Sequence, residues 1–394
     1  MSKVDVKVVV GSNYGDEGKG MATHFFSHNA KKQLCLNVLY NGGCQRGHTV
    51  ELKNGKRHIF HHFGSGTYSK AHTFFDKDFM VNPMVFIDEL NQLQTEDKVT
   101  PVCIASPKCR VTTPYDMFIN QIIETARDKN RHGSCGYGIW ETQKRYEDGQ
   151  YALFFGELMD KTNDEILKYL NGIAHDYLPK RLKYYGITKI PDEYKKLIDS
   201  PGLAEHYLID LREMQRIVRI ATFKRIREWY GTIVFEGAQG LALDENNVAA
   251  FPYVTASKTT SLIPVERVSD MDANIEVCYI TRSYFTKHGA GFFSTECAKN
   301  KINANIEDRT NIRNDYQEEI RYGTFDITEF LSRVQNDMKS SKAIRPDLKT
   351  SVFITHLNYT NDIAGNCTLQ DLKQYFDYTY KSYTKFIEDI KEND

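Results

Sequence analysis

The sequence lacks an excess of charge of either sign, because its 51 lysines and arginines are balanced by 52 aspartates and glutamates. Proteins that bind nucleic acid or anionic membranes through surface charge carry a basic excess. No run approaches the roughly 20 apolar residues of a membrane span, and the N-terminal Met-Ser-Lys-Val-Asp-Val-Lys lacks the apolar stretch of a signal peptide. We therefore expect a soluble, cytoplasmic protein with small-molecule partners, which binds neither nucleic acid nor membrane.

Short cysteine spacings are also lacking. The eight cysteines include no Cys-x-x-Cys pair and no other metal-type spacing, so we expect reduced thiols. Internal repeats and low-complexity linkers are absent. A chain of 394 residues can bury a substantial core. We predict one large α/β domain over 1–394 rather than two independent domains.

Six short apolar runs rich in β-branched and aromatic residues are typical of buried strands in a mostly parallel sheet: 6–10, 34–40, 102–105, 232–235, 277–281 and 352–355. Apolar residues at three- and four-residue spacing predict helices packed on that sheet at 115–128, 206–230 and 327–338. We further predict a helical excursion beside the site at about 156–230, and a terminal helix over 369–392.

The most informative segment follows the valine-rich run Val4–Val10. Residues 11–20 read Gly-Ser-Asn-Tyr-Gly-Asp-Glu-Gly-Lys-Gly, a strand-loop-helix passage whose backbone N–H groups can hold phosphate. The ordinary phosphate-loop motif requires glycine in place of Asn13 and a hydroxyl in place of Gly20. The loop instead contains acidic side chains, which repel phosphate unless a metal or a proton transfer uses them. This pattern predicts nucleotide chemistry of an unusual kind.

Four further segments follow in order: Asn-Gly-Gly-Cys-Gln-Arg-Gly-His-Thr-Val at 41–50, Phe-Glu-Gly-Ala-Gln-Gly-Leu-Ala-Leu-Asp at 235–244, Pro-Tyr-Val-Thr at 252–255 and Gly-Ala-Gly-Phe-Phe-Ser-Thr-Glu at 289–296. With residues 11–20 they resemble the ordered motifs of the adenylosuccinate synthetase family. The resemblance is much weaker over the last hundred residues. It implies a mostly parallel α/β fold related to P-loop NTPases, a homodimer, and a Mg²⁺-dependent ligase for a purine nucleoside monophosphate, a nucleoside triphosphate and L-aspartate.

That reaction replaces a purine 6-oxo group by an amine, so N1–H must be deprotonated and the 6-oxygen phosphorylated. The resemblance implies that Asp16 is the general base and, with the Gly47 carbonyl, a Mg²⁺ ligand. It makes His48 the general acid, Lys19 a phosphate ligand and Gln239 a hydrogen-bond partner of purine O6. Outside such motifs, an aspartate in a glycine-rich turn usually forms an Asx turn and a histidine near a strand end is usually structural.

The other expected contacts also follow from the resemblance. The nucleotide- and phosphate-binding residues would be Gly15, Glu17, Gly18, Gly20, Asn41, Gly47, Thr49, Ser134, Cys135, Thr255 and Asn358. The aspartate-binding residues would be Thr295 and Arg321, with Arg309 and Arg313 as further candidates, and Arg145 is a candidate for contact with the partner subunit's site.

The sequence departs from the family pattern at several positions. The family's Thr-Lys-Leu-Asp, whose carboxylate reads guanine, is Thr355-His-Leu-Asn358 here, and an amide suits adenine better. The monophosphate loop Gly-Thr-Thr-Gly appears as Gly-Ser-Cys-Gly at 133–136, and the arginine-rich aspartate loop retains few arginines. Arg46 stands where the family has alanine, and it could contact phosphate or solvent.

These departures favour the phage branch of the family, which joins L-aspartate to dGMP with an adenine nucleotide and gives N6-succino-2-amino-dAMP for 2-aminoadenine DNA. Members of that branch replace the loop carboxylate by serine, whereas Asp16 is retained here. A carboxylate can accept from guanine N1–H and the 2-amino group, and it equally fits IMP. The alternatives are an ordinary adenylosuccinate synthetase using IMP and GTP, a non-catalytic nucleotide-binding protein, and an ordinary phosphate-loop switch.

Overall fold

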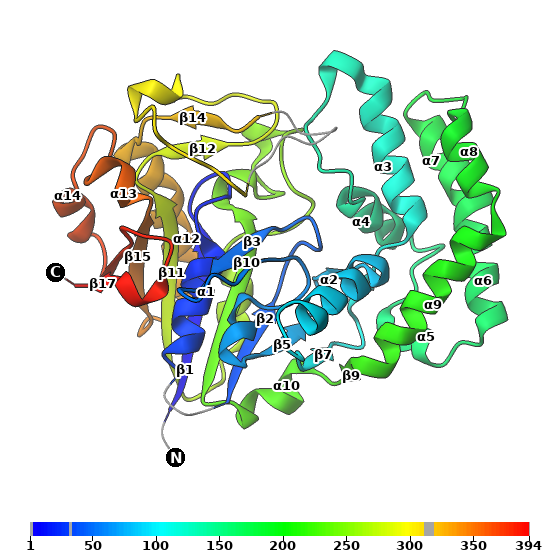
Figure 1. The fold of residues 1–394 in the computed structure, drawn as a ribbon, viewed down its shortest axis with the longest axis horizontal. Helices are drawn as coiled ribbons and strands as arrows, with labels where there is room; N and C mark the ends of the chain where they lie inside the picture. Colours follow the sequence, from blue (N-terminus) through cyan, green and yellow to red (C-terminus); the bar gives the residue numbers. More distant parts are fainter. Residues whose placement is uncertain (1–2, 31–33, 311–318, 394) are drawn as a thin grey trace.

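A mostly parallel sheet forms the centre of the molecule (Figure 1). The computed structural model describes residues 3–30, 34–310 and 319–393. Within these residues, ten strands pair in the order β17-β16-β15-β11-β1-β10-β2-β5-β7-β9, and all neighbours are parallel except β16 and β17. The α/β fold predicted from the sequence is confirmed.

The sheet strands are β1 (Val4–Gly11), β2 (Cys35–Leu39), β5 (His72–Phe75), β7 (Cys103–Ala105), β9 (Arg219–Ile220), β10 (Thr232–Gly240), β11 (Ala273–Arg282), β15 (Lys349–Thr355), β16 (Tyr378–Lys381) and β17 (Lys391–Glu392). Smaller sheets contain β3 (His48–Glu51) with β4 (Arg57–Phe60), β6 (Met80–Val81) with β8 (Arg110–Val111), and β12 (Phe285–Lys287), β14 (Arg321–Gly323) and β13 (Glu296–Cys297).

The helices are α1 (Lys19–His28), α2 (Pro83–Thr95), α3 (Pro114–Arg127), α4 (Ile139–Asp148), α5 (Phe155–Met159), α6 (Asn163–Gly172), α7 (Leu178–Tyr184), α8 (Asp192–Ile198), α9 (Pro201–Ile217), α10 (Phe223–Ile226), α11 (Leu262–Arg267), α12 (Ile327–Ile344), α13 (Leu357–Thr360) and α14 (Leu369–Lys373).

Strand β1 lies between β10 and β11 and is covered on both faces, which explains its valine-rich sequence. Val6, Val8, Val9 and Val10 have no exposed surface. Parallel strands end at one edge of the sheet, and ligands of such folds bind at that edge. Residues 11–20 leave β1 at this edge, so the sheet itself positions the predicted phosphate loop.

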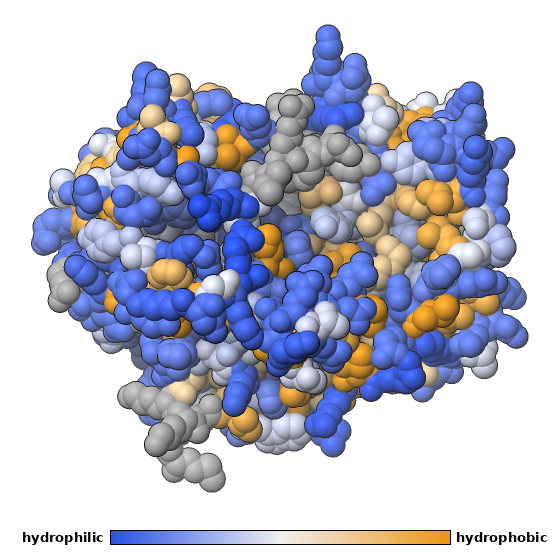
Figure 2. Space-filling view, in the orientation of Figure 1, coloured by the Kyte–Doolittle hydropathy of each residue, from blue (hydrophilic) through white to orange (hydrophobic). Residues whose placement is uncertain are grey.

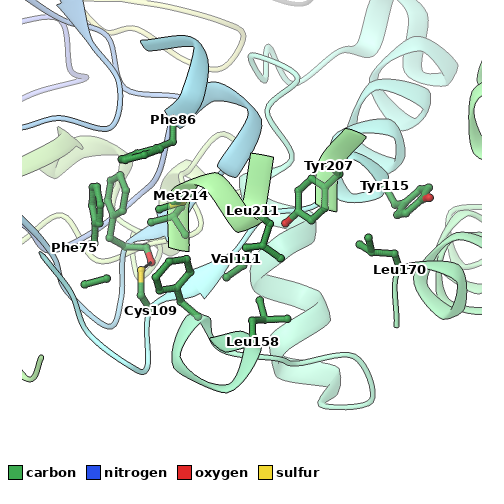
Figure 3. Close-up of a cluster of buried hydrophobic side chains, with 14 of the residues drawn as sticks. Phe75, Phe86, Cys109, Val111, Tyr115, Leu158, Leu170, Tyr207, Leu211 and Met214 are labelled. Atoms are coloured by element: carbon green, nitrogen blue, oxygen red, sulfur yellow. Dashed lines mark hydrogen bonds between the residues drawn. The ribbon is translucent and has the colours of Figure 1, made fainter. Parts of the chain in front are cut away.

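The segment from α5 to α9 is mostly helical and packs beside the sheet, as the green part of Figure 1 shows. Leu211 and Met214 of α9 lie in one buried cluster with Phe75 of β5 and Phe86 of α2 (Figure 3). The helical segment α5–α9 and the part of the sheet around β5 therefore share one hydrophobic core.

Two predicted helices are wrong in part. Helix α9 ends at Ile217, and β9 pairs with β7 where the sequence predicted a helix continuing to residue 230. The predicted terminal helix over 369–392 is only α14, followed by β16 and β17. Tyr380 of β16 packs its ring 5.4 Å from that of Phe26. Packing of Tyr380 against helix α1 overrides the helix-like spacing of the segment.

Arg145 does not reach toward a partner subunit, contrary to the sequence-based prediction. Its guanidinium is fully buried and forms a two-pronged ion pair with Asp116, both bonds 2.8 Å long. It also donates to the carbonyls of Val111 and Tyr151 and to the hydroxyl of Tyr169. Arg145 therefore joins α3 and α4 to the helical segment from within.

We expect Arg145→Met to lower the free energy of unfolding by about 3–5 kcal/mol, because it leaves the buried Asp116 carboxylate without its counter-ion. Urea denaturation followed by circular dichroism measures this difference. The matched control is Arg216→Met, since Arg216 is an exposed arginine on α9; its effect should stay within about 0.5 kcal/mol. Equal stability of the two variants would contradict the structural role of Arg145.

None of the helices in the described residues is long and apolar enough to span a membrane. The face shown in Figure 2 is mainly hydrophilic. All eight cysteines are free thiols, as predicted.

Candidate active site

A cleft of about 850 Å³ opens where β1, β10, β11 and β15 end. Its walls come from segments far apart in the sequence: 14–21, 45–49, 132–140, 252–256, 287–290, 307–310, 355–359 and 384–386. Fourteen of the predicted site residues line it: Gly15, Asp16, Glu17, Gly18, Lys19, Gly20, Gly47, His48, Thr49, Ser134, Cys135, Gln239, Thr255 and Asn358. The fold thus brings most of the predicted site together.

The phosphate loop is closed by its own acidic residue. The Glu17 carboxylate accepts the N–H of Asn13 at 2.5 Å, and its carbonyl accepts the Thr355 hydroxyl. Gly18 has φ 101° and precedes α1, and a Cβ there would lie 2.7 Å from the Thr355 side chain. Glycine is therefore needed at this position. The positive end of the α1 dipole points to where an anion would bind.

Two residues of this loop, Glu17 and Lys19, form a buried pair of opposite charge. Lys19 Nζ is 4.0 Å from Oε2 of Glu17, and both side chains are buried. Burial raises the pKa of Glu17 to about 7 and lowers that of Lys19. Oε2 of Glu17 accepts no hydrogen bond within the described residues. Lys19 lines the cleft at this longer ion-pair distance from Glu17, so its amino group can bind an anionic ligand.

His48 is oriented by a carboxylate from another strand. Its Nδ1 lies 2.6 Å from Oε1 of Glu236 on β10. Glu236 also accepts the N–H of Ser65 at 3.0 Å, as well as the Ser65 hydroxyl. Although burial alone would raise it, the Arg46 guanidinium and the His48 bond hold the pKa of Glu236 at about 2. An ionised Glu236 requires the proton on Nδ1 of His48, which leaves Nε2 for a ligand.

Arg46 is not solvated, which excludes one of the two alternatives left open by the sequence. It is 2% exposed, donates from Nη2 to the carbonyl of Phe63 at 2.8 Å and lies 3.3 Å from Oε2 of Glu236. Its charge helps to keep Glu236 ionised. Arg46 also lines the cleft, and its Nε and Nη1 have no hydrogen-bond partner among the described residues, so contact with a phosphate stays a prediction.

Asp16 has φ 54°, an uncommon conformation for a residue other than glycine. Nε of the buried Arg282 donates to its carbonyl at 2.5 Å, and Arg282 is paired with Asp308 at 2.8 Å. The Asp16 carboxylate itself is 29% exposed and lies 3.5 Å from Nε2 of His288. Its backbone is fixed while its side chain remains accessible to a ligand.

Gln239 shares this unusual backbone conformation, with φ 64°. It lies near the end of β10, and a Cβ on Gly15 would lie 3.6 Å from its side-chain oxygen. Strained residues that a fold tolerates cluster at functional sites. Asp16 and Gln239 both line the cleft, so their strain supports a functional role for this edge.

The loop between α3 and α4 forms another wall. The Ser134 hydroxyl donates to Asn120 at 2.8 Å, and the N–H groups of His132 and Gly133 donate to Glu124. Burial raises the pKa of Cys135 to about 11, so its thiol stays neutral. These donors are engaged within the protein, so phosphate binding by Ser134 and Cys135 stays a prediction.

Asn358 lies on α13, is exposed and lines the cleft, as does its neighbour Tyr359. The N-cap of α13 is His356, so Asn358 does not cap the helix. Its side-chain amide forms no hydrogen bond with the described residues, and it is free to pair with a ligand.

Three predicted residues lie outside the cleft lining of the described chain. Asn41 bonds the backbone of Ala238 and Lys258. Arg321 holds Glu296 through a two-pronged ion pair, and the Thr295 hydroxyl is buried. Their predicted ligand contacts remain predictions. Arg309 lines the cleft, and Arg313 lies outside the described residues.

The sequence reasoning missed Glu236, Arg282, His288 and Asn120. Glu236 is part of a motif that was recognised, Phe-Glu-Gly-Ala-Gln-Gly, so a carboxylate within it was a usable signal. The others contact predicted residues only through the fold. Nothing in their local sequence marks them.

The residues at the predicted metal position fit Mg²⁺. Asp16 offers an accessible carboxylate and Gly47 lines the same cleft, which are hard oxygen donors of the kind Mg²⁺ prefers. The described residues include no group of three or more His, Cys, Asp or Glu that could hold a metal. A site of one carboxylate completed by substrate phosphates is usual for Mg²⁺.

The chain is similar to known proteins over most of its length. A family model described as adenylosuccinate synthetase matches residues 8–344. The chain is 30% identical over 298 residues to the adenylosuccinate synthetase of Lactobacillus acidophilus and 32% identical over 301 residues to that of Cyanothece sp.. These alignments cover 73% of this chain, and 64% and 62% of the relatives. The matched chain thus spans less than two thirds of the length of these relatives.

Two solved structures share the fold, each with a TM-score of 0.65. The fully ligated adenylosuccinate synthetase of Plasmodium falciparum is 21% identical, and the match covers 91% of this chain and 78% of that one. The cyanophage S-2L succinoaminodeoxyadenylate synthetase, bound to dGMP and dATP, is 14% identical, and the match covers 99% and 95% of the two chains.

Proposed function

Because the chain belongs to the adenylosuccinate synthetase family, we propose that it joins L-aspartate to the 6-position of a purine nucleoside monophosphate at the expense of a nucleoside triphosphate. The observation that carries the proposal is the cleft in which the phosphate loop, Asp16, the His48–Glu236 pair and Gln239 meet. The products would be an N6-succinyl nucleotide, a nucleoside diphosphate and phosphate.

Asp16 is the proposed general base. Its carboxylate is accessible while the Arg282 bond fixes its backbone, so it can take the proton from purine N1 without moving the phosphate loop. Loss of that proton makes the 6-oxygen nucleophilic, and the Gln239 amide would donate to this oxygen. Mg²⁺ held by Asp16 and Gly47 would neutralise charge on the phosphates.

His48 is the proposed general acid. Burial lowers its pKa to about 4, so the ligand-free imidazole is neutral at pH 7. A phosphate beside Nε2 would raise this pKa, because it places a second negative charge opposite Glu236. The imidazolium then donates from Nε2 to the phosphoryl group in transfer, while Lys19 and the loop amides hold its other oxygens.

We propose an adenine nucleotide, ATP or dATP, as the donor. The free Asn358 amide can accept from adenine N6–H and donate to adenine N1. Guanine presents hydrogen-bond donors at N1–H and at the 2-amino group, so only the side-chain oxygen of Asn358 could pair with it. A guanine donor remains the alternative if another loop reads the base.

We propose dGMP as the favoured acceptor, with IMP in an ordinary synthetase reaction as the alternative. The Asp16 carboxylate can accept from guanine N1–H and the 2-amino group together. The cyanophage structure named above covers nearly the whole of both chains and was determined with dGMP and dATP. At 14% identity it supports the fold alone, but it makes this substrate pair the first to test. A homodimer and a cytoplasmic location stay predictions.

The test crosses IMP, GMP and dGMP with ATP, dATP and GTP, in the presence of Mg²⁺ and L-aspartate. Phosphate release and the mass of the succinylated nucleotide are both measured. We expect aspartate-dependent product from dGMP with an adenine nucleotide, and none after Mg²⁺ is chelated. Product from IMP and GTP only would identify the ordinary reaction, and phosphate release without aspartate would contradict the ligase proposal.

A further inference from the structure

Glu329 and Arg333, near the start of α12, form an ion pair that contacts the phosphate loop 11–20. Arg333 donates from Nε to the carbonyl of Ser12 at 3.2 Å and from Nη2 to Oδ1 of Asn13 at 2.6 Å. Its Nη1 lies 2.5 Å from Oε1 of Glu329, one helical turn earlier. Arg333 thereby fixes the first residues of loop 11–20 with all three of its nitrogens engaged.

Glu329 extends the same contact to a second loop. Its Oε1 accepts the Tyr14 hydroxyl at 3.1 Å, and its Oε2 accepts the Ser294 hydroxyl at 2.5 Å. Ser294 belongs to segment 289–296 and precedes Thr295, which the sequence predicted to bind L-aspartate. The rings of Tyr14 and Phe293 also meet edge to face at 5.3 Å. One carboxylate therefore bridges the phosphate loop 11–20 and segment 289–296.

The bridge is partly buried at its Tyr14 end, whereas Ser294 is exposed. The side chains of Arg333 and Glu329 are 16% and 27% exposed, and the Arg333 guanidinium lies 5.6 Å from the centre of the Tyr14 ring. Burial, with a further contribution from Glu329, raises the pKa of Tyr14 to about 12, so the hydroxyl remains a donor. An exposed ion pair of this spacing on a helix contributes little to stability. The remaining oxygen and nitrogen atoms of this pair instead form hydrogen bonds with loop 11–20 and with Ser294.

We propose that Glu329 and Arg333 are positioning residues that couple segment 289–296 to the phosphate loop 11–20. The inference rests on the proposed function, with the phosphates held by loop 11–20, and on the prediction that Thr295 of segment 289–296 binds L-aspartate. A carboxylate ligand that orders segment 289–296 strengthens the Ser294 bond, and through Glu329 it holds Tyr14 in place. By linkage, a nucleotide in the phosphate loop tightens amino-acid binding by the same factor.

Two single substitutions and their combination test the coupling. Tyr14→Phe and Ser294→Ala each remove one hydroxyl from Glu329. Each should raise the KM for L-aspartate and the KM for the triphosphate together, by about 5-fold or more. The double variant should be no worse than either single one, because either cut breaks the bridge. Tyr177→Phe is the matched control, since that hydroxyl bonds Asp148 at 3.0 Å outside the cleft lining; both KM values should stay unchanged.

A second readout needs no turnover. Hydrogen exchange in the ligand-free protein should quicken in residues 289–296 of Tyr14→Phe, and in residues 11–20 of Ser294→Ala. Additive KM effects, a Ser294→Ala change confined to L-aspartate, or unchanged exchange in the opposite loop would overturn the coupling. If wild-type protein forms no succinylated nucleotide, the proposed function fails, and the exchange data still decide whether the bridge links the loops.

Discussion

His48→Ala should lower kcat by about 10²- to 10⁴-fold, because it removes the group that donates a proton to the phosphoryl group in transfer. Nucleotide affinity should change little, since Lys19 and the loop amides hold the phosphates independently. Steady-state turnover with saturating substrates measures the first quantity, and isothermal calorimetry with the triphosphate measures the second.

The His48 prediction has an internal comparison and a control. Glu236→Gln keeps the shape of the pair and removes the charge that favours the imidazolium, so kcat should fall less than in His48→Ala. His28→Ala changes an exposed histidine at the end of α1, outside the cleft lining, and should leave turnover unchanged. Full activity of His48→Ala would remove His48 from the mechanism.

Asn358→Asp should change the ratio of kcat/KM for ATP to that for GTP by roughly 10- to 150-fold in favour of GTP, the range expected for a hydrogen bond to a charged group. The carboxylate accepts from guanine N1–H and the 2-amino group, whereas it faces the unprotonated N1 of adenine with no proton to donate. Competition between the two triphosphates, with the diphosphate products separated by chromatography, measures the ratio directly.

Asn361→Asp is the matched control for this change in preference between ATP and GTP. Asn361 follows the same short helix α13 and is exposed, but it lies outside the cleft lining. The added negative charge is therefore similar in position, while no contact with the base is available. An equal change in both variants would indicate a general electrostatic effect, and no change in Asn358→Asp would show that another loop reads the base.

Much of the fold was predictable because buried parallel strands have a local signature. The run Val6–Val10 became the centre of β1, and residues 277–281 and 352–355 fell within β11 and β15. The terminal segment failed because its aromatic spacing suits a helix as well as a strand. Contacts such as the Tyr380 ring on Phe26 decide between the two, and these are non-local.

Part of the candidate site was likewise predictable from the sequence, and part was not. The motifs predicted Asp16, Lys19, His48 and Gln239 as site residues, and all four line one cleft. Each motif includes its own turn or strand end, which depends on local sequence. Arg321 is paired with Glu296 instead of facing the cleft, which no spacing in the sequence indicated. Local sequence fixes a backbone shape, whereas a charged side chain chooses its partner in the assembled fold.

The sequence by itself determined the parallel α/β core, the phosphate loop and the family, since these depend on local backbone preferences and on ordered motifs. Only the tertiary structure decided that Glu236 orients His48 across 188 positions of the chain, and that Glu329 bridges Tyr14 and Ser294. The physical reason is that hydrogen bonds and buried charges act over a few ångströms in space, and the sequence carries no measure of that distance.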